Sequence, residues 1–421
     1  MKRIFLIITL VACALICATA HPKTTEHIAY ALRTDSIMPE DSVQADTVID
    51  NIRAEESLRA RVTKLLDNDI FERTQVGLYI YDLTADTLVI AYHERQCMRP
   101  ASNEKLMTAI TALNDLGVNY QYNTRLYVDQ LPQEGDSIFS GHVYIRAGYD
   151  PLFNADDMHA FARELKAHGI TRITSPICLD LSMKDDKLLG WGWCWDDDEV
   201  PTTPLLFNNR DTFIENMRRI FQAEDIEWDG TTTEHRTPSG ATLLCNRTHN
   251  IDDVLVPMMK KSNNSMAESM FYQIAAQGDR TKVGRKQAVG HYNALISHIG
   301  LDPSHYQIAD GSGLSLYNYL TPELLGRMLR YAYNDDDIFR HLHQSLPIAG
   351  RDGTLRKRMR GTSAAGNVHA KTGTVEGVST LSGYCTTAKG NVLCFSIMNQ
   401  GIRHTSTGRN FQDRVCKALC K

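Results

Sequence analysis

Segments with the hydrophobic pattern of strands and segments with the pattern of helices follow one another along the chain. Together they predict a mixed α/β fold. In the stretch VGLYIYDLTADTLVIAYHE (76–94), two short runs rich in β-branched and aromatic residues predict two strands joined at Ala85-Asp86. Residues 52–68 instead carry apolar side chains at helical spacing and predict a helix. Near the other end of the chain, the same patterns predict strands over 379–388 and 391–400 and a helix over 408–421.

The pattern changes between residues 124 and 245. Short apolar runs there predict strands over 125–130, 142–148 and 172–181, with one helix over 158–169. Strongly helical patterns return over 254–277 and 323–334. A chain of 421 residues has room for two domains. We therefore expect an α/β (α+β) domain built from residues 51–123 and 246–421, with a smaller strand-rich accessory domain, 124–245, inserted into it.

The first twenty residues have the organisation of a secretory signal peptide. Lys2 and Arg3 precede an apolar run, and Ala18-Thr19-Ala20 forms a small-x-small cleavage site. A competing interpretation is a bacterial lipobox ending at Cys13, which would then be the lipidated first residue. Because the apolar run continues past Cys13, we favour cleavage after Ala20. The protein is then exported to the periplasm, or alternatively anchored as a lipoprotein through Cys13, and residues 21–50 form a flexible polar leader.

Charge and cysteine content exclude some functions. A formal net charge of −5 argues against nucleic-acid binding as the main activity. There is no C-x-x-C pair, and we interpret His341-Leu-His343 as part of a helix rather than a zinc site. Cys13 and Cys17 lie in the signal peptide. The eight other cysteines permit disulfides in an exported protein, but their pairing stays open, as does the oligomeric state.

Candidate chemistry begins at Ser102 and Lys105, in the stretch MRPASNEKLMTAI. Leu106, Ala109 and Ile110 follow with the spacing of a buried helix face, which puts Ser102 at a helix N-terminus and Lys105 one turn further on. One interpretation is an N-cap serine with a solvated lysine. The other is a nucleophile whose proton is taken by a lysine of lowered pKa. Taken alone, the S-x-x-K spacing favours the interpretation as an N-cap serine with a solvated lysine.

Two further motifs favour the interpretation of Ser102 as a nucleophile. Ser262-Asn263-Asn264 is an S-x-N in a loop that opens a helix. Lys371-Thr372-Gly373 is a K-T-G at the start of a strand, where Gly373 would give a ligand close access to the backbone. The order S-x-x-K, S-x-N, K-T-G is the signature of penicillin-binding proteins and serine β-lactamases.

Longer segments carry a resemblance to one branch of these proteins. ADGSGLSLYNYLTP, SLPIAGRDGTLRKRM and AKTGTVEGVSTLSGY, together with the inserted GHVYIRAGYDPLF, GITRITSPICLDLS and WCWDDDEVPTTPLLFNN, resemble the class C low-molecular-mass penicillin-binding proteins. These form the D-alanyl-D-alanine carboxypeptidase/endopeptidase family. Ala147 and Tyr149 depart from glycines in the family's pattern. The resemblance runs from about residue 51 to the end and implies a β-lactamase-like transpeptidase domain with an inserted accessory domain.

The resemblance also implies a mechanism and roles for single residues. Ser102 would attack the D-Ala-D-Ala carbonyl, with Lys105 as its general base and Ser262 bridging Lys105 to Lys371. The substrate would be held by five residues: Asn264, Lys371, Thr372, Gly373 and Thr374. The backbone N–H groups of Ser102 and Thr374 would form the oxyanion hole. No metal or organic cofactor is implied. The expected partners are peptidoglycan stem peptides and inhibitory β-lactams, with membrane association, peripheral or through a lipid, left open.

Several other residues admit a structural and a functional interpretation. We expect Trp191, Trp193 and Trp195 to pack within the accessory domain rather than to stack on glycan. The acidic run 196–199 is expected to be a solvated loop, with attraction of a stem-peptide amine as the alternative. We interpret the segment 310–313 as a turn lining the site, not as a source of the nucleophile.

Two rival functions remain open. A serine β-lactamase would need an efficient deacylating water, and no E-x-x-L-N-type segment stands out between S-x-N and K-T-G. A catalytically silent peptidoglycan-binding protein of the same fold would not need all the motif residues, yet all are intact here.

Overall fold

The computed structural model describes residues 57–133, 135–197 and 199–421. The predicted signal peptide (1–20), the leader (21–50) and Cys13 lie outside these residues. The chain divides into two compact units, of which Leu58–Lys421 is the larger.

A five-stranded antiparallel sheet brings the two ends of this larger unit together. Its strand order is β11-β12-β13-β1-β2. The strands are β1 (Gln75–Asp82), β2 (Thr87–Tyr92), β11 (His369–Val375), β12 (Val378–Thr386) and β13 (Val392–Gln400). The predicted hairpin and the two predicted C-terminal strands are confirmed.

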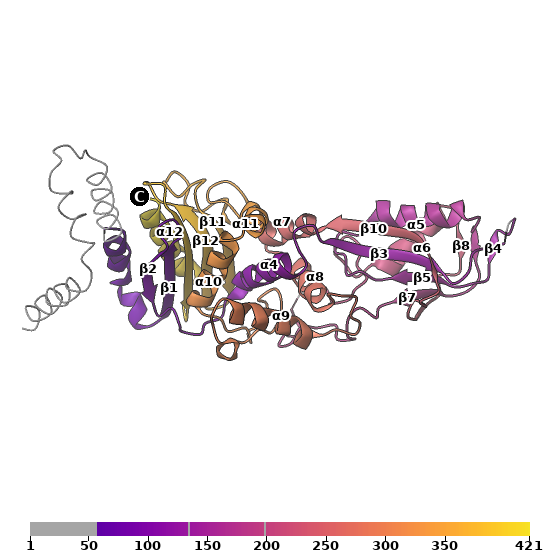
Figure 1. Ribbon diagram of the computed structural model, residues 1–421, viewed down its shortest axis with the longest axis horizontal. Coiled ribbons are helices and arrows are strands. Elements are labelled where there is room, and N and C mark those ends of the chain that lie inside the picture. The colour runs from indigo at the N-terminus through magenta and orange to yellow at the C-terminus, as the bar shows by residue number, and fades with distance from the viewer. Residues whose placement is uncertain (1–56, 134, 198) are drawn as a thin grey trace, which may run out of the picture. The chain divides into compact units, whose positions relative to one another are not determined.

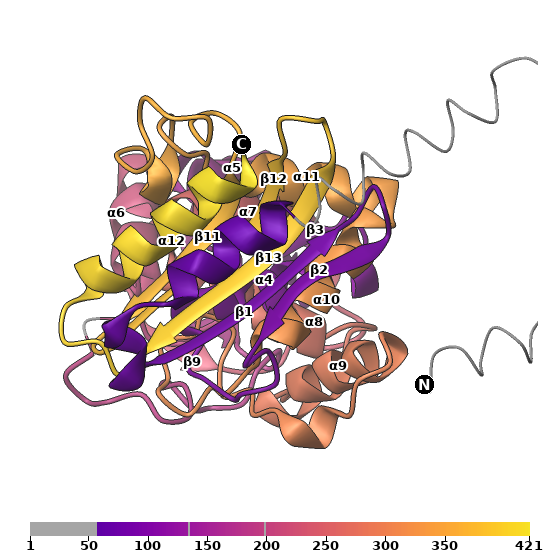
Figure 2. The same cartoon turned by 90° about the vertical axis from the view of Figure 1, so that its left-hand side faces the viewer.

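Both faces of this sheet are buried. Along β1, Leu78 and Ile80 enter one hydrophobic core while Tyr79 and Tyr81 enter the other, as a period of two requires. The first core is closed by helical residues 57–66 and by α12 (Thr405–Leu419). Figure 2 shows α12 lying across the sheet. Burying each leucine or isoleucine contributes about 1.5–3 kcal/mol, so the sheet is a firm support for what attaches to it.

Helices form the core on the other side of the sheet, where α10 packs directly on β1, β12 and β13 and the others pack on one another. They are α4 (Glu104–Asp115), α7 (Ile251–Lys261), α8 (Asn264–Ala275), α9 (Arg285–His298), α10 (Pro322–Tyr333) and α11 (Asp336–Ser345). The short 3-10 turns are η2 (Asp69–Glu72), η3 (Ala101–Asn103), η4 (Pro303–His305) and η5 (Gly353–Leu355). Helix α4 differs from the predicted one-faced pattern, because it is buried on all sides from Glu104 to Leu113. The other helices surround it, and this also buries its polar side chains.

A separate core lies in the inserted region. Its larger sheet has the order β10-β3-β5-β7-β9 and its smaller one the order β4-β6-β8. The strands are β3 (Gln121–Val128), β4 (Ile138–Phe139), β5 (Val143–Arg146), β6 (Arg172–Ile173), β7 (Ile177–Asp180), β8 (Glu227–Trp228), β9 (Thr232–Glu234) and β10 (Thr242–Asn250). Helices α5 (Ala155–Ala167) and α6 (Phe213–Ala223) pack against each other, and α5 lies beside β10 (Figure 1).

Two details of this region differ from the sequence prediction. The run 172–181 forms two strands, β6 and β7, because Pro176 interrupts it and cannot donate a ladder hydrogen bond. The larger sheet begins at Gln121 and ends at Asn250, slightly outside the predicted limits of 124 and 245.

The eight cysteines of the described residues are free thiols. Cys416 and Cys420, one turn apart on α12, are both buried in the core beneath the main sheet together with Cys385. Within residues 57–133, 135–197 and 199–421, no helix is both long and apolar enough to span a bilayer.

Candidate active site

Ser102 lies directly after a strained backbone position, Ala101. Ala101 has a φ of +47°, a left-handed conformation that costs a non-glycine residue on the order of 1 kcal/mol or more. Ser102 follows in η3, and Asn103 occupies the N-cap position of α4. The interpretation of Ser102 as an N-cap serine is therefore wrong. Its hydroxyl instead accepts a hydrogen bond from Lys105.

The amine of Lys105 is buried and has three partners. Its Nζ lies 3.1 Å from Ser102 Oγ, 2.6 Å from Asn264 Oδ1 and 2.7 Å from the backbone oxygen of Ser312. The residue is 0% exposed. The first partner belongs to its own turn, the second begins α8, and the third lies in the 310–313 turn. The S-x-x-K and S-x-N motifs thus meet at one nitrogen atom.

A second buried lysine lies in the K-T-G strand. Lys371 donates to Ser262 Oγ at 2.8 Å and to the backbone oxygen of Thr372 at the same distance. Ser262 has a φ of +59° and ends α7, so its left-handed turn directs the chain into α8. Ser262 thus contacts Lys371 as predicted, whereas Lys105 bonds to Ser102, Asn264 and Ser312 and not to Ser262, so only half of the predicted bridge is present.

Gly373 lets strand β11 pack against the turn that carries Ser102. A Cβ atom at position 373 would lie 2.1 Å from Thr380 Oγ1 and 2.6 Å from the Pro100 oxygen. That threonine donates to Pro100 O at 2.8 Å and accepts from Asn103 Nδ2 at 2.9 Å. The sequence predicted access for a ligand at Gly373. The structure adds another reason for glycine there, the close approach of two protein segments.

The remaining predicted residues lie on β11 and α8. Thr372 is half-buried, and its hydroxyl donates to Thr354 Oγ1 at 2.8 Å. Thr374 is exposed and accepts a 3.4 Å hydrogen bond from Arg409. Asn264 uses its amide oxygen on Lys105 and donates its amide nitrogen to Glu199 Oε1.

Three buried carboxyl groups lie near Lys105. The predicted turn 310–313 does line the site and contains one of them, but no carboxyl role was predicted from the sequence. Glu104, Glu268 and Asp310 are each at most 1% exposed. Asp310 accepts hydrogen bonds that shape the 310–318 segment, and Glu268 accepts from the Gly311 N–H at 3.1 Å. Neither carboxyl oxygen of Glu104 has a hydrogen-bond partner among the described residues. The sequence signals were their positions: Glu104 directly precedes Lys105, Glu268 comes one turn after Asn264, and Asp310 opens the 310–313 turn.

The tryptophan-rich loop of the inserted region reaches this site. Trp193 donates its indole N–H to Asp310 Oδ2 at 2.8 Å, and the Trp191 ring lies 5.1 Å from that of Tyr317. Trp195 is 91% exposed. The expectation that these tryptophans pack within the accessory domain is wrong, because their loop leaves that core and lines the catalytic loop. At its end, Glu199 contacts Asn264, so the acidic run is not wholly solvated.

Burial dominates the electrostatics of both lysines. It lowers the pKa of Lys105 from 10.5 to about 8, against the opposing effect of Asp310, Glu268 and Glu199. Burial, followed by the charge of Lys105, lowers the pKa of Lys371 well below 10.5. Burial and then Asp310 raise the pKa of Glu268 to about 8. Burial is therefore the main cause of the lowered pKa that the nucleophile interpretation requires of Lys105.

Comparison with known proteins identifies the family of the chain. Residues 58–205 and 199–420 match the model of the D-Ala-D-Ala carboxypeptidase 3 (S13) family. The chain belongs to this family. It is 25% identical over 423 residues to D-alanyl-D-alanine carboxypeptidase DacB of Haemophilus influenzae, covering 80% of this chain and 87% of that protein. It is 26% identical over 441 residues to a D-alanyl-D-alanine carboxypeptidase of Actinomadura sp., covering 82% and 81%.

Solved structures of S13-like proteins share the fold. The crystal structure of penicillin-binding protein 4 (dacB) from Haemophilus influenzae superposes with a TM-score of 0.75 at 21% identity, covering 86% of this chain and 98% of that one. A penicillin G-acylated endopeptidase of Bdellovibrio bacteriovorus gives 0.52 at 18% identity, covering 77% and 86%. The predicted penicillin-binding-protein fold and the predicted family are confirmed.

The packing at Gly373 generates a testable prediction. We expect Gly373→Ala to slow labelling by a fluorescent penicillin by at least about a hundredfold, because a displacement of about 1 Å at a catalytic site can cost that much. Gly290→Ala is the matched control, since a Cβ there meets nothing within 4 Å and the backbone is not in the left-handed region. Labelling of Gly373→Ala at the wild-type rate, with unchanged melting temperature, would contradict this account.

Proposed function

We propose that this S13 family member is a serine D-Ala-D-Ala carboxypeptidase/endopeptidase that cleaves peptidoglycan stem peptides through an acyl-serine intermediate. The observation that carries the proposal is the buried Lys105 amine, 3.1 Å from Ser102 Oγ. A serine hydroxyl needs a base within hydrogen-bond reach, and a lysine serves only when it can lose its proton near neutral pH. Burial gives Lys105 that property.

The acylation step uses Ser102 and Lys105. When Lys105 is neutral, the hydrogen bond between them reverses and the Ser102 hydroxyl becomes the donor. Its oxygen attacks the carbonyl carbon of the scissile bond while its proton moves to Lys105. The C–N bond then breaks, the amine leaves with a proton, and the acyl group stays on Ser102. Water releases the acyl group and restores the hydroxyl.

The other motif residues bind and orient the substrate. Lys371 and Thr372 would meet the terminal carboxylate, with the buried Lys371 amine and the half-buried Thr372 hydroxyl as neighbouring donors on β11. Ser262, already bonded to Lys371, would carry a proton toward the leaving amine. Asn264 would bind a substrate amide in place of Glu199, with the N–H groups of Ser102 and Thr374 as the oxyanion hole. Gly373 keeps β11 close to Ser102.

β-Lactams would acylate Ser102 stably. Two related structures support this proposal by what they contain. Penicillin-binding protein 4 of Haemophilus influenzae was solved with a β-lactam, and a Bdellovibrio endopeptidase was solved acylated by penicillin G. Membership of a carboxypeptidase family and the assembled Ser102–Lys105 pair favour this function over a β-lactamase or a silent binding protein.

The proposed location follows from the N-terminal sequence. Lys2, Arg3 and the apolar run before Ala20 support export to the periplasm, where peptidoglycan is accessible. Lipidation at Cys13 is the alternative, and it would hold the enzyme at the membrane surface.

Product analysis tests the proposed activity. We expect the mature protein to release D-alanine from a pentapeptide muropeptide, and to cleave a cross-linked dimer if the endopeptidase activity is present. Ser102→Ala should abolish both reactions while preserving the fold. Liquid chromatography with mass spectrometry measures the products. Release of D-alanine by Ser102→Ala at the wild-type rate would overturn the proposal.

The titration of Lys105 predicts a pH profile. Its neutral form is the base, so acylation should rise about tenfold per pH unit below the pKa of about 8 and level off above it. The second-order rate constant for a fluorescent penicillin, measured from about pH 6 to 9.5, reports this profile. Lys105→Arg should not be labelled at any of these pH values, because arginine keeps its proton. A rate that is constant across this range would rule out Lys105 as the base.

A further inference from the structure

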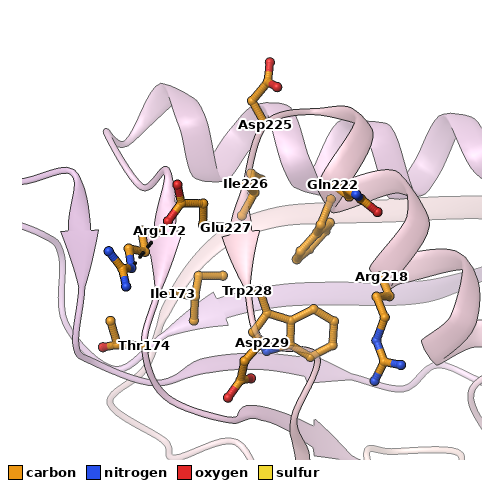
Figure 3. A pocket seen from close by; sticks show the side chains of 11 residues that line it. Arg172, Ile173, Thr174, Arg218, Gln222, Asp225, Ile226, Glu227, Trp228 and Asp229 are labelled. Carbon is orange, nitrogen blue, oxygen red and sulfur yellow. Dashed lines mark ion pairs between the residues drawn. The ribbon is translucent and has the colours of Figure 1, made fainter.

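A surface pocket of about 820 Å³ lies in the inserted region, away from every catalytic residue named above. It is formed by strands β6 and β8, helix α6 and the turns that follow them. Figure 3 shows its side chains. This volume is in the range of sites that bind small organic ligands, about 300–1,000 Å³.

Trp228 lies in the middle of the pocket. Its indole N–H donates to the backbone oxygen of Thr231 at 3.1 Å, and the Phe221 ring packs edge-on at 6.1 Å. These contacts fix the plane of the ring, and the side chain is only partly buried. Ile173 and Ile226, both 3% exposed, complete an apolar base. The result is a rigid aromatic surface that is still accessible from solvent.

Planar polar groups surround this aromatic surface. Arg218 is held by a 2.7 Å hydrogen bond to the Gly230 oxygen, and Arg172 pairs with Glu227 at 3.5 Å (Figure 3). Asp229 Oδ1 accepts from both the N–H and the hydroxyl of Thr231 at 2.8 Å, an arrangement that lowers the pKa of Asp229. Internal bonds therefore preorganise these groups, and their remaining donors and acceptors can bind a ligand.

The exposed amide of Gln222 adds a donor and an acceptor to the rim. In Figure 3 the Asp225 carboxylate points away from the Trp228 ring.

This combination of groups suits a neutral or weakly charged sugar. An aromatic face packs against the C–H face of a pyranose, while carboxylate, amide and guanidinium groups pair with its hydroxyl and acetamido groups. The carboxylates of Glu227 and Asp229 match the two guanidinium groups of Arg172 and Arg218, and Asp225 adds a third carboxylate on the rim, so the pocket carries no excess of positive charge. This balance disfavours a polyanion such as a nucleic acid or a polyphosphate.

We propose that this pocket binds the glycan strand of peptidoglycan through its N-acetylated amino sugars. The inference rests on the proposed function, because the stem peptide that enters the active site is covalently attached to such a strand. A second binding site on the same polymer raises the effective concentration of the substrate without new contacts at Ser102. The inserted domain thus acts as a glycan-binding module of the enzyme.

The test uses a sugar without any stem peptide. Isothermal titration of the mature protein with a β-1,4-linked N-acetylglucosamine tetramer should give saturable binding. Acylation of Ser102 by benzylpenicillin should leave this binding unchanged, because the two sites share no residue. Binding that is lost on acylation would place the sugar in the catalytic cleft and overturn the proposal, as would the absence of binding.

Three variants locate the site. Trp228→Leu keeps an apolar side chain against Phe221 but removes the flat ring, and it should weaken binding at least about tenfold, as truncation of an aromatic anchor does. Arg218→Ala should also weaken it. Arg219→Ala is the matched control, since Arg219 is an exposed neighbour on α6 that does not line the pocket. Unchanged affinity in both pocket variants would contradict the proposal.

Two readouts separate this inference from the proposed function. The variants Trp228→Leu and Arg218→Ala should release D-alanine from a free pentapeptide at the wild-type rate, but turn over intact peptidoglycan more slowly. If the wild type binds the sugar but releases no D-alanine, the glycan site stands and the proposed activity fails. If it releases D-alanine but binds no sugar, only the glycan site fails.

Discussion

The active site depends on one interaction, the burial of the Lys105 amine among partners from separate segments of the chain. A lysine ammonium removed from water costs several kcal/mol unless hydrogen-bonding partners surround it. Lys105 obtains them from its own turn, from Asn264 at the start of α8 and from the Ser312 carbonyl. These partners are spread over more than 200 residues of sequence, so the amine is satisfied only when α4, α8 and the 310–313 turn come together. The same burial lowers the pKa of Lys105 and gives its amine the proton affinity of a base.

The surroundings of Lys105 limit how far that pKa falls. Burial acts in opposite directions on acids and bases, so it raises the pKa of Glu104 and Glu268 while lowering those of Lys105 and Lys371. Near neutral pH the site can therefore hold neutral acids beside a lysine close to its titration point. Asp310 lies beside these groups and accepts hydrogen bonds from three N–H donors of its own loop and from the Trp193 indole. Through that indole, the inserted domain helps to shape the catalytic loop.

Periodicity and motif order predicted much of this architecture. The near-continuous apolar run of β1 reflects a sheet buried on both faces. The three motifs predicted Ser102, Lys105, Ser262 and Lys371 because their chemistry depends on residue type and local spacing. Tertiary packing could not be predicted in this way. The helical pattern after Lys105 indicates one apolar face and does not show that α4 is enclosed on all sides. Similarly, no local pattern shows that Trp193 pairs with a carboxylate 117 residues away, or that a Cβ at Gly373 would meet Pro100.

The segments around Lys105 make Ser102, and not another serine of the site, the nucleophile. Ser262 and Ser312 lie in the same site and provide an internal comparison. The most direct measurement is peptide mapping by mass spectrometry of the mature protein after brief exposure to benzylpenicillin. The account predicts one penicilloyl group per chain, on the peptide that contains Ser102. A folded protein that carries no adduct, or an adduct on Ser262 or Ser312, would contradict it.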